Sequence, residues 1–73
     1  MRLRDATSGK SYRVVAVGFD PDGPHYEMRG TLEGFMKFRG DAVGVFQGGG
    51  SFKFLVRPDD VIELEEEKRR YIW

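Results

Sequence analysis

The chain has 73 residues, of which 40% are hydrophobic and 33% charged, with ten Gly and no Cys. This length suits one small domain over residues 1–73, and no run is long and apolar enough for a membrane span or a secretory signal. Without cysteine there are no disulfides or thiolate metal sites, and the single His25 leaves too few ligands for zinc. We expect a soluble cytoplasmic protein with no metal and no cofactor.

Charges balance over the whole chain but not along it. Twelve Lys/Arg and twelve Asp/Glu give a formal charge of zero, which argues against bulk attraction to nucleic acid. Residues 1–57 carry nine basic and six acidic residues, net +3, whereas residues 58–73 carry three and six, net −3. This asymmetry is typical of a solvated acidic end, and the alternative is a basic face with the acidic residues kept apart from it.

The first predicted strand covers residues 11–19, which are rich in β-branched and aromatic residues. Turn-forming residues at Asp20–Pro24 join it to the next segment. From His25 to Phe38 the even positions are apolar or glycine, and a period of two over this length predicts one long strand. Gly30 and Gly34 on its inner face would allow it to bend sharply.

The rest of the chain predicts shorter strands separated by turns, and no segment has a convincing helical pattern. Five strands joined by tight turns predict an all-β fold, a five-stranded, strongly bent antiparallel barrel of the SH3-like kind over about residues 11–66. A charged and aromatic tail over 67–73 follows, and we expect Tyr71-Ile72-Trp73 to dock on a neighbouring surface. The remaining strands are predicted at 42–47, 51–57 and 61–65, with turns at 39–41, 48–50 and 58–60.

Two stretches of the chain resemble the two motifs of the Sm and Sm-like (LSm) family. Arg29-Gly30-Thr31-Leu32-Glu33-Gly34-Phe35, followed by Phe38, is similar to the first motif, Gly-x-Leu-x-Gly-Phe with an aromatic residue a few positions on. Leu55 to Leu64 is similar to the second, an apolar strand ending Ile-Arg-Gly-Asp/Asn-x-Val, with Pro58 in place of Gly. The resemblance covers roughly residues 12 to 65 and implies a homo-oligomeric ring of about five to seven copies that binds RNA.

The chain departs from the family at the positions that read uridine. Family members that bind uridine-rich RNA carry Asp directly after Gly-Phe and Met-Asn after the aromatic residue. This chain has Met36 and Arg39-Gly40 there, and it contains no Asn. Because an Asn amide supplies both a donor and an acceptor to a base edge, uridine reading of the usual kind is not expected.

Self-association is expected on physical grounds as well. Below about 70 to 80 residues one core seldom stabilises a fold comfortably without disulfides or metal. The β-prone segment Phe52–Val56 would be an aggregation hazard at an open sheet edge, and the resemblance implies that this fourth strand pairs with the fifth strand of the next copy. Filling of the subunit's own core is the alternative role for the interface candidates, which are Phe46, Phe54, Leu55, Val61 and Ile62.

No combination of residues points to catalysis, because there is no Cys, one His and only three Ser without an evident base. The protein is therefore not expected to be an enzyme. The remaining candidate site is a basic set interleaved with aromatic residues, since Lys and Arg neutralise phosphates and aromatic rings stack on single-stranded bases. That set comprises Lys37, Arg39, Lys53 and Arg57 with Phe35, Phe38 and Phe54.

Within this set we predict that Phe38 stacks on a base and that Lys37, Arg39 and Arg57 contact phosphates, with Asp59 orienting Arg57. The function predicted from the sequence is thus a non-catalytic, ring-forming protein that binds RNA or another single-stranded nucleic acid. The alternative is a homo-oligomeric scaffold or protein-interaction module that presents its acidic, aromatic tail to a partner and binds no nucleic acid.

Overall fold

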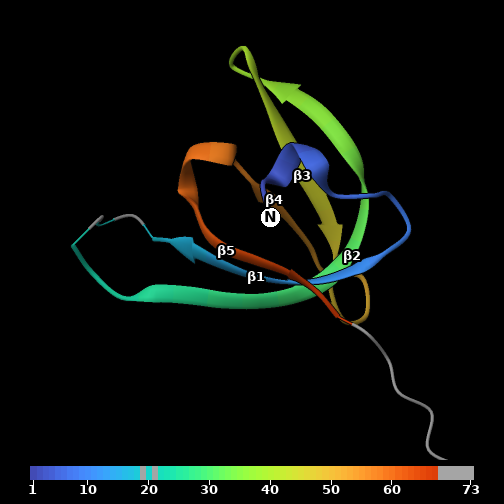
Figure 1. Cartoon of the computed structure of the whole chain (residues 1–73), viewed down its shortest axis with the longest axis horizontal. Helices are drawn as coiled ribbons and strands as arrows, with labels where there is room; N and C mark the ends of the chain where they lie inside the picture. The colour runs from blue at the N-terminus through green and yellow to red at the C-terminus, as the bar shows by residue number, and fades with distance from the viewer. Residues whose placement is uncertain (19, 21, 68–73) are drawn as a thin grey trace, which may run out of the picture.

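A computed structural model of the chain describes residues 1–18, 20 and 22–67. Five strands form one antiparallel sheet in the order β4-β3-β2-β1-β5 (Figure 1), which confirms the prediction of a five-stranded antiparallel all-β fold. The elements are the 3-10 turn η1 (Leu3–Asp5), β1 (Ser11–Val17), β2 (His25–Phe38), β3 (Asp41–Gln47), β4 (Lys53–Val56), the 3-10 turn η2 (Pro58–Asp60) and β5 (Val61–Glu66).

The sheet curls around its core without closing into a barrel. β4 and β5 are the two ends of the strand order, and no pairing joins them among the described residues. After β4 the chain turns through η2, and β5 then pairs with β1 from Ala16 opposite Val61 to Tyr12 opposite Glu66. The expected closed barrel is therefore corrected to an open, curved sheet, in which β4 and β5 each have one side without a strand partner in the described chain.

The long strand β2 belongs to both halves of the sheet. Residues 25–31 pair with β1 and residues 31–38 pair with β3, and a register shift between Leu32 and Gly34 interrupts the pairing with β3. Gly30 is needed because a Cβ there would lie 2.7 Å from the carbonyl oxygen of Gln47, whereas a Cβ on Gly34 would meet no atom within 4 Å. The close approach of the Gln47 backbone therefore explains why residue 30 is a glycine, and it does not explain Gly34.

The core lies on the concave side of the curved sheet. Phe46 is at its centre, with its ring stacked on Phe54 at 5.1 Å between centroids and edge-to-face with Tyr12 at 6.3 Å. Leu3 from η1 is only 4% exposed and joins this cluster, and the backbone N–H of Thr7 donates to the Tyr12 hydroxyl at 2.7 Å. The N-terminal segment, for which no helix was expected, thus covers part of the core with a single 3-10 turn.

Several sequence predictions differ from the structure at the ends of strands. Of the even-numbered β2 side chains expected to face inward, Leu32 is buried and Met28 is partly buried, but Tyr26, Met36 and Phe38 are about half exposed. The reason is that β2 extends beyond the core at both ends. The first strand ends at Val17 rather than at residue 19.

Three earlier expectations fall partly or wholly outside the described residues. They concern Phe19 at the predicted strand end, Pro21 in the predicted turn, and the docking of Tyr71-Ile72-Trp73. In the part of the chain that the structure covers, no helix has the length and apolar character needed to cross a membrane.

Candidate functional site

The β2–β3 hairpin presents an aromatic ring together with cations. Its two turn residues, Arg39 and Gly40, both have positive φ, 52° and 86°, which matches the twist of a tight hairpin. The Arg39 guanidinium carbon lies 5.4 Å from the centre of the Phe38 ring, within cation–π distance. Phe38 remains 45% exposed, so the hairpin offers an accessible ring with a positive charge beside it.

Arg57 is held at the start of η2 by Asp60. Its Nε donates to Asp60 Oδ2 at 2.8 Å and its Nη2 donates to Oδ1 at 3.1 Å. The expected partner was Asp59, and this is corrected: in a 3-10 turn residues i and i+3 lie on the same side, so Asp60 and not Asp59 faces Arg57. The hydrogen bond and charge of Asp60, with smaller contributions from Asp41 and Asp59, raise the pKa of Arg57 although partial burial opposes them.

A groove of about 660 Å³ brings Phe38 and Arg57 together with the β1–β2 hairpin. Tyr26 and Met28 come from the first half of β2, and Tyr26 is 53% exposed. The sequence analysis did not assign these two residues to the site, although they belong to the same even-numbered apolar series as Phe38. The groove is lined by Ala16, Val17, Gly18, Tyr26, Glu27, Met28, Phe38, Arg57 and Asp60.

The N-terminal turn adds arginines to the same end of the molecule. Arg4 lines a small recess of about 170 Å³ together with Phe35, Ala42 and Pro58. Ala42 pairs with Lys37, which places Arg4 near the base of the β2–β3 hairpin. The sequence analysis missed this contribution, and the available signal was the alternation of Arg2, buried Leu3 and Arg4.

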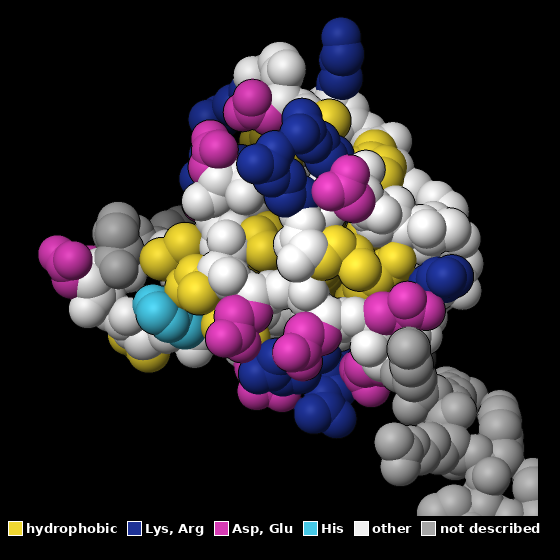
Figure 2. Space-filling view, in the orientation of Figure 1, with side chains coloured by type: hydrophobic (Ala, Val, Ile, Leu, Met, Phe, Trp, Pro, Cys, Tyr) yellow, Lys and Arg dark blue, Asp and Glu magenta, His cyan; other side chains and the backbone are white. Residues whose placement is uncertain are grey.

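Ion pairing divides the cations of the described chain into two groups. Arg13 lies 3.3 to 3.4 Å from carboxylates of Glu27, Glu63 and Glu65, and these raise its pKa although its burial acts in the opposite direction. Figure 2 shows a group of Lys and Arg side chains at the end that carries η1 and the hairpin, with Asp and Glu side chains beside it. Lys10, Arg13, Arg29, Lys53 and Arg57 form ion pairs within the described chain, while Arg2, Arg4, Lys37 and Arg39 form none there.

Two members of the predicted basic and aromatic set do not join the site. Lys53 pairs in register with Gln47, at the far end of β3 from the hairpin, and its ammonium lies 2.9 Å from Glu33. Phe54 is buried beneath Phe46 in the core. The structure therefore brings Phe38 and Arg57 to one groove, with Arg39 beside Phe38 and with Asp60 in the role expected of Asp59. Lys37 is the neighbour of Phe38 on β2 and does not line the groove.

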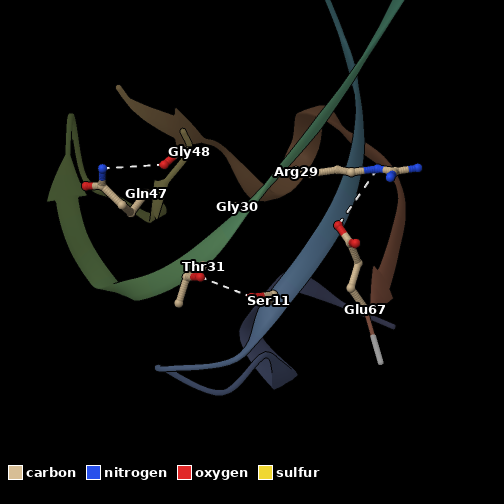
Figure 3. A pocket seen from close by; sticks show the side chains of 7 residues that line it. All are labelled: Ser11, Arg29, Gly30, Thr31, Gln47, Gly48 and Glu67. Carbon is tan, nitrogen blue, oxygen red and sulfur yellow. Dashed lines mark hydrogen bonds and ion pairs between the residues drawn. The ribbon is translucent and has the colours of Figure 1, made fainter. Parts of the chain in front are cut away.

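A second hollow, of about 280 Å³, lies at the opposite end of β3 (Figure 3). The hydroxyls of Ser11 and Thr31 are hydrogen-bonded at 3.0 Å, and Arg29 Nε lies 3.8 Å from Glu67. The amide nitrogen of Gln47 donates to the Gly50 carbonyl at 2.6 Å. Because these polar groups already have partners in the chain, the hollow is a weaker candidate for a ligand site.

The five interface candidates fall into residues that pack in the subunit core and residues that are exposed on the edge strands. Phe46 is 0% exposed and Phe54 is buried beside it, so both fill the subunit core and neither offers a surface to a partner. Val61 packs against the same core. Leu55 on β4 and Ile62 on β5 are 52% and 45% exposed on the two edge strands. The alternation along β4, with Phe54 and Val56 inward, explains why Leu55 is the exposed residue.

Among the described residues no group of three or more His, Asp or Glu is arranged to hold a metal ion. What the hairpin end offers is an exposed ring, an adjacent apolar groove and several cations. The family models, curated proteins and solved structures compared with this chain include no match.

Proposed function

We propose that the protein binds single-stranded nucleic acid, RNA in particular, without catalysis, through the end formed by η1, the β2–β3 hairpin and Arg57. The observation that carries this proposal is that the cations without an ion pair in the described chain belong to η1 with its N-cap and to the β2–β3 hairpin, while the other described cations have carboxylate partners. Cations without an intramolecular partner are available to neutralise phosphates. An exposed ring beside them provides a stacking surface for a base.

The mode of binding follows from the side chains present. Lys37 and Arg39 would contact phosphates, and Phe38 would stack on a base at the mouth of the groove. No amide side chain lines the groove. Stacking and phosphate contacts tolerate many sequences, and any preference among bases must come from the other polar groups that line the groove.

A single copy provides few phosphate contacts, and we propose that self-association multiplies them. In the proposed assembly β4 of one copy pairs with β5 of the next, so that an Sm-like barrel is completed between copies and a homo-oligomeric ring closes. This is supported by the two unpaired strand edges and by exposed Leu55 and Ile62 on them. Repeating the hairpin end around a ring would turn weak contacts into useful affinity by avidity.

The test is fluorescence anisotropy with labelled oligo-adenosine and oligo-uridine at low salt, on the full chain. We expect binding, and we expect Phe38→Ala to weaken it about 5- to 50-fold because one stacked base is lost. The matched control is Phe52→Ala, which removes a more exposed ring outside the groove. If neither oligonucleotide binds the wild-type chain, or if both variants weaken binding equally, the proposed function is wrong.

The second candidate function is a protein-interaction module. It is favoured by the apolar side chains that line the large groove, among them Tyr26, Met28 and Phe38. Removing residues 68–73 separates the two candidates, because a module that presents its tail would lose partner capture. Unchanged oligonucleotide binding after that deletion would fit the proposed function.

A further inference from the structure

The large groove has two aromatic walls that come from opposite ends of β2. Tyr26 lies in the β1–β2 hairpin, opposite Ala16, and Phe38 lies at the start of the β2–β3 turn. Both are about half exposed, and both line the same groove of about 660 Å³. This volume is within the range of sites that enclose a small organic ligand.

Each aromatic wall is held in place by a neighbouring group. The Tyr26 ring lies directly on the backbone of Gly18, where any Cβ would collide with ring atom Cε2 and would stand 3.1 Å from Cδ2. Phe38 carries the Arg39 guanidinium over its ring, and Arg39 does not line the groove. The cation therefore contacts Phe38 without lining the groove.

Two carboxylates, those of Glu27 and Asp60, line the groove. Among the described residues Arg57 is the only cation in this lining, and it is already bound by Asp60 through two hydrogen bonds. Glu27 also lines the groove, and both of its ion pairs, to Arg13 and Arg29, use Oε1 and leave Oε2 outside them. Ionised carboxylates only accept hydrogen bonds, so the groove favours a ligand edge that donates them.

We infer that the groove takes one nucleobase between Tyr26 and Phe38 and that it prefers bases with an exocyclic amino group, adenine or cytosine, over uracil. This inference rests on the proposed function. An amino group can donate to the Asp60 or Glu27 carboxylate, as carboxylates accept from cytosine N4 in nucleic-acid complexes. Uracil has no amino group, and its one base donor, the ring N3–H, lies between two carbonyl oxygens that a carboxylate repels. The phosphates remain outside the groove, toward Lys37 and Arg39.

The experiment compares oligo-adenosine, oligo-cytidine and oligo-uridine of equal length on the full chain by anisotropy. We expect oligo-adenosine and oligo-cytidine to bind at least about 5-fold more tightly than oligo-uridine. Asp60→Asn should reduce this preference, because an amide can donate to the uracil carbonyls as well as accept.

Tyr26→Leu should lower the affinity for all three oligonucleotides about 5-fold or more, because the stacking on the Tyr26 ring is lost. Gly18→Ala should act in the same direction by displacing the Tyr26 ring, and Tyr26→Leu keeps the test intact if Gly18→Ala fails to fold. Gly49→Ala is the control, since a Cβ there would meet no atom within 4 Å.

The outcomes separate this inference from the proposed function. Binding that is lost in Phe38→Ala, unchanged in Tyr26→Leu and equal for the three bases would overturn the inference and leave the proposed function standing. No binding of any oligonucleotide would overturn both. An amino-base preference that disappears in Asp60→Asn, together with weaker binding in Tyr26→Leu, would support the inference.

Discussion

Arg57 and Asp60 hold each other across η2 through two hydrogen bonds, so the cation that lines the groove already has a carboxylate partner within the chain. Both hydrogen bonds are charge-assisted, and the pair has the fork geometry that a phosphate would also satisfy. Like any arginine, Arg57 is charged at neutral pH, and the hydrogen bond and charge of Asp60 raise its pKa further. A ligand phosphate at Arg57 must therefore compete with Asp60.

The first prediction concerns this competition. Asp60→Asn removes a negative charge next to the ligand and weakens the hold on Arg57. We expect oligo-uridine to bind about 3- to 10-fold more tightly, with a steeper salt dependence because one more cation becomes available. The measurement is the apparent Kd at several salt concentrations, with Asp59→Asn as the control. Equal effects of the two variants would show that Asp60 has no special relation to Arg57.

The second prediction concerns the two glycines of β2. Gly30→Ala places a Cβ 2.7 Å from the Gln47 carbonyl and 3.0 Å from the Phe54 ring, and Gly34→Ala meets nothing within 4 Å. We expect Gly30→Ala to lower the free energy of unfolding by about 1 to 3 kcal/mol through overpacking, and Gly34→Ala to be nearly neutral. Urea unfolding monitored by circular dichroism measures both. Equal destabilisation would mean that close approach at Gly30 is not the reason for a glycine there.

The third prediction concerns the edge strands. Leu55→Lys and Ile62→Lys place charges on the exposed faces of β4 and β5, and charged edges oppose strand pairing between copies. We expect each substitution to lower the average mass in analytical ultracentrifugation while circular dichroism shows the fold intact. Met36→Lys, a similarly exposed position on a central strand, is the control. A wild-type chain that stays monomeric at all concentrations contradicts the proposed ring.

The fourth prediction concerns the carboxylates around Arg13. Arg13→Gln leaves Glu27, Glu63 and Glu65 close together without their shared cation. We expect a modest fall in the urea midpoint at low salt that shrinks in 1 M NaCl, because salt screens exposed charges. Arg39→Gln should show no such salt-dependent loss, since Arg39 has no ion pair in the described chain. A salt-independent loss in Arg13→Gln would point to packing of its side chain instead.

Much of the sheet could be predicted from the sequence because its signals are local. The period of two along residues 25–38 predicts β2, and the Arg39-Gly40 pair predicts the hairpin that follows it. How far β2 extends beyond the core is not local information. It depends on the length of the strands packed beside it, and for this reason Tyr26 and Phe38 became groove walls although their pattern matches that of buried Leu32.

The site was harder to predict for two reasons. It depends on which of two adjacent side chains faces a partner, and on contacts between segments that are distant in the sequence. Whether Asp59 or Asp60 faces Arg57 is decided by the 3-10 geometry of η2, which three residues do not reveal in advance. The inclusion of Arg4 depends on Leu3, which enters a core made by strands far along the chain. Lys53 has the same charge as Lys37, and only its pairing with Glu33 sets it apart.

The most direct test of the account compares two double variants with the same change in net charge. Lys37→Gln with Arg39→Gln removes unpaired cations at the hairpin, and Lys10→Gln with Lys53→Gln removes cations paired with Glu66 and Glu33. The measurement is oligo-adenosine affinity against salt concentration. The quantity compared is the slope of the logarithm of the binding constant against the logarithm of the salt concentration. We predict that the hairpin variant makes this slope shallower by about 1.4, because two phosphate contacts are lost, and that the other variant has the wild-type slope. Equal slopes for the two variants would contradict binding at the hairpin end.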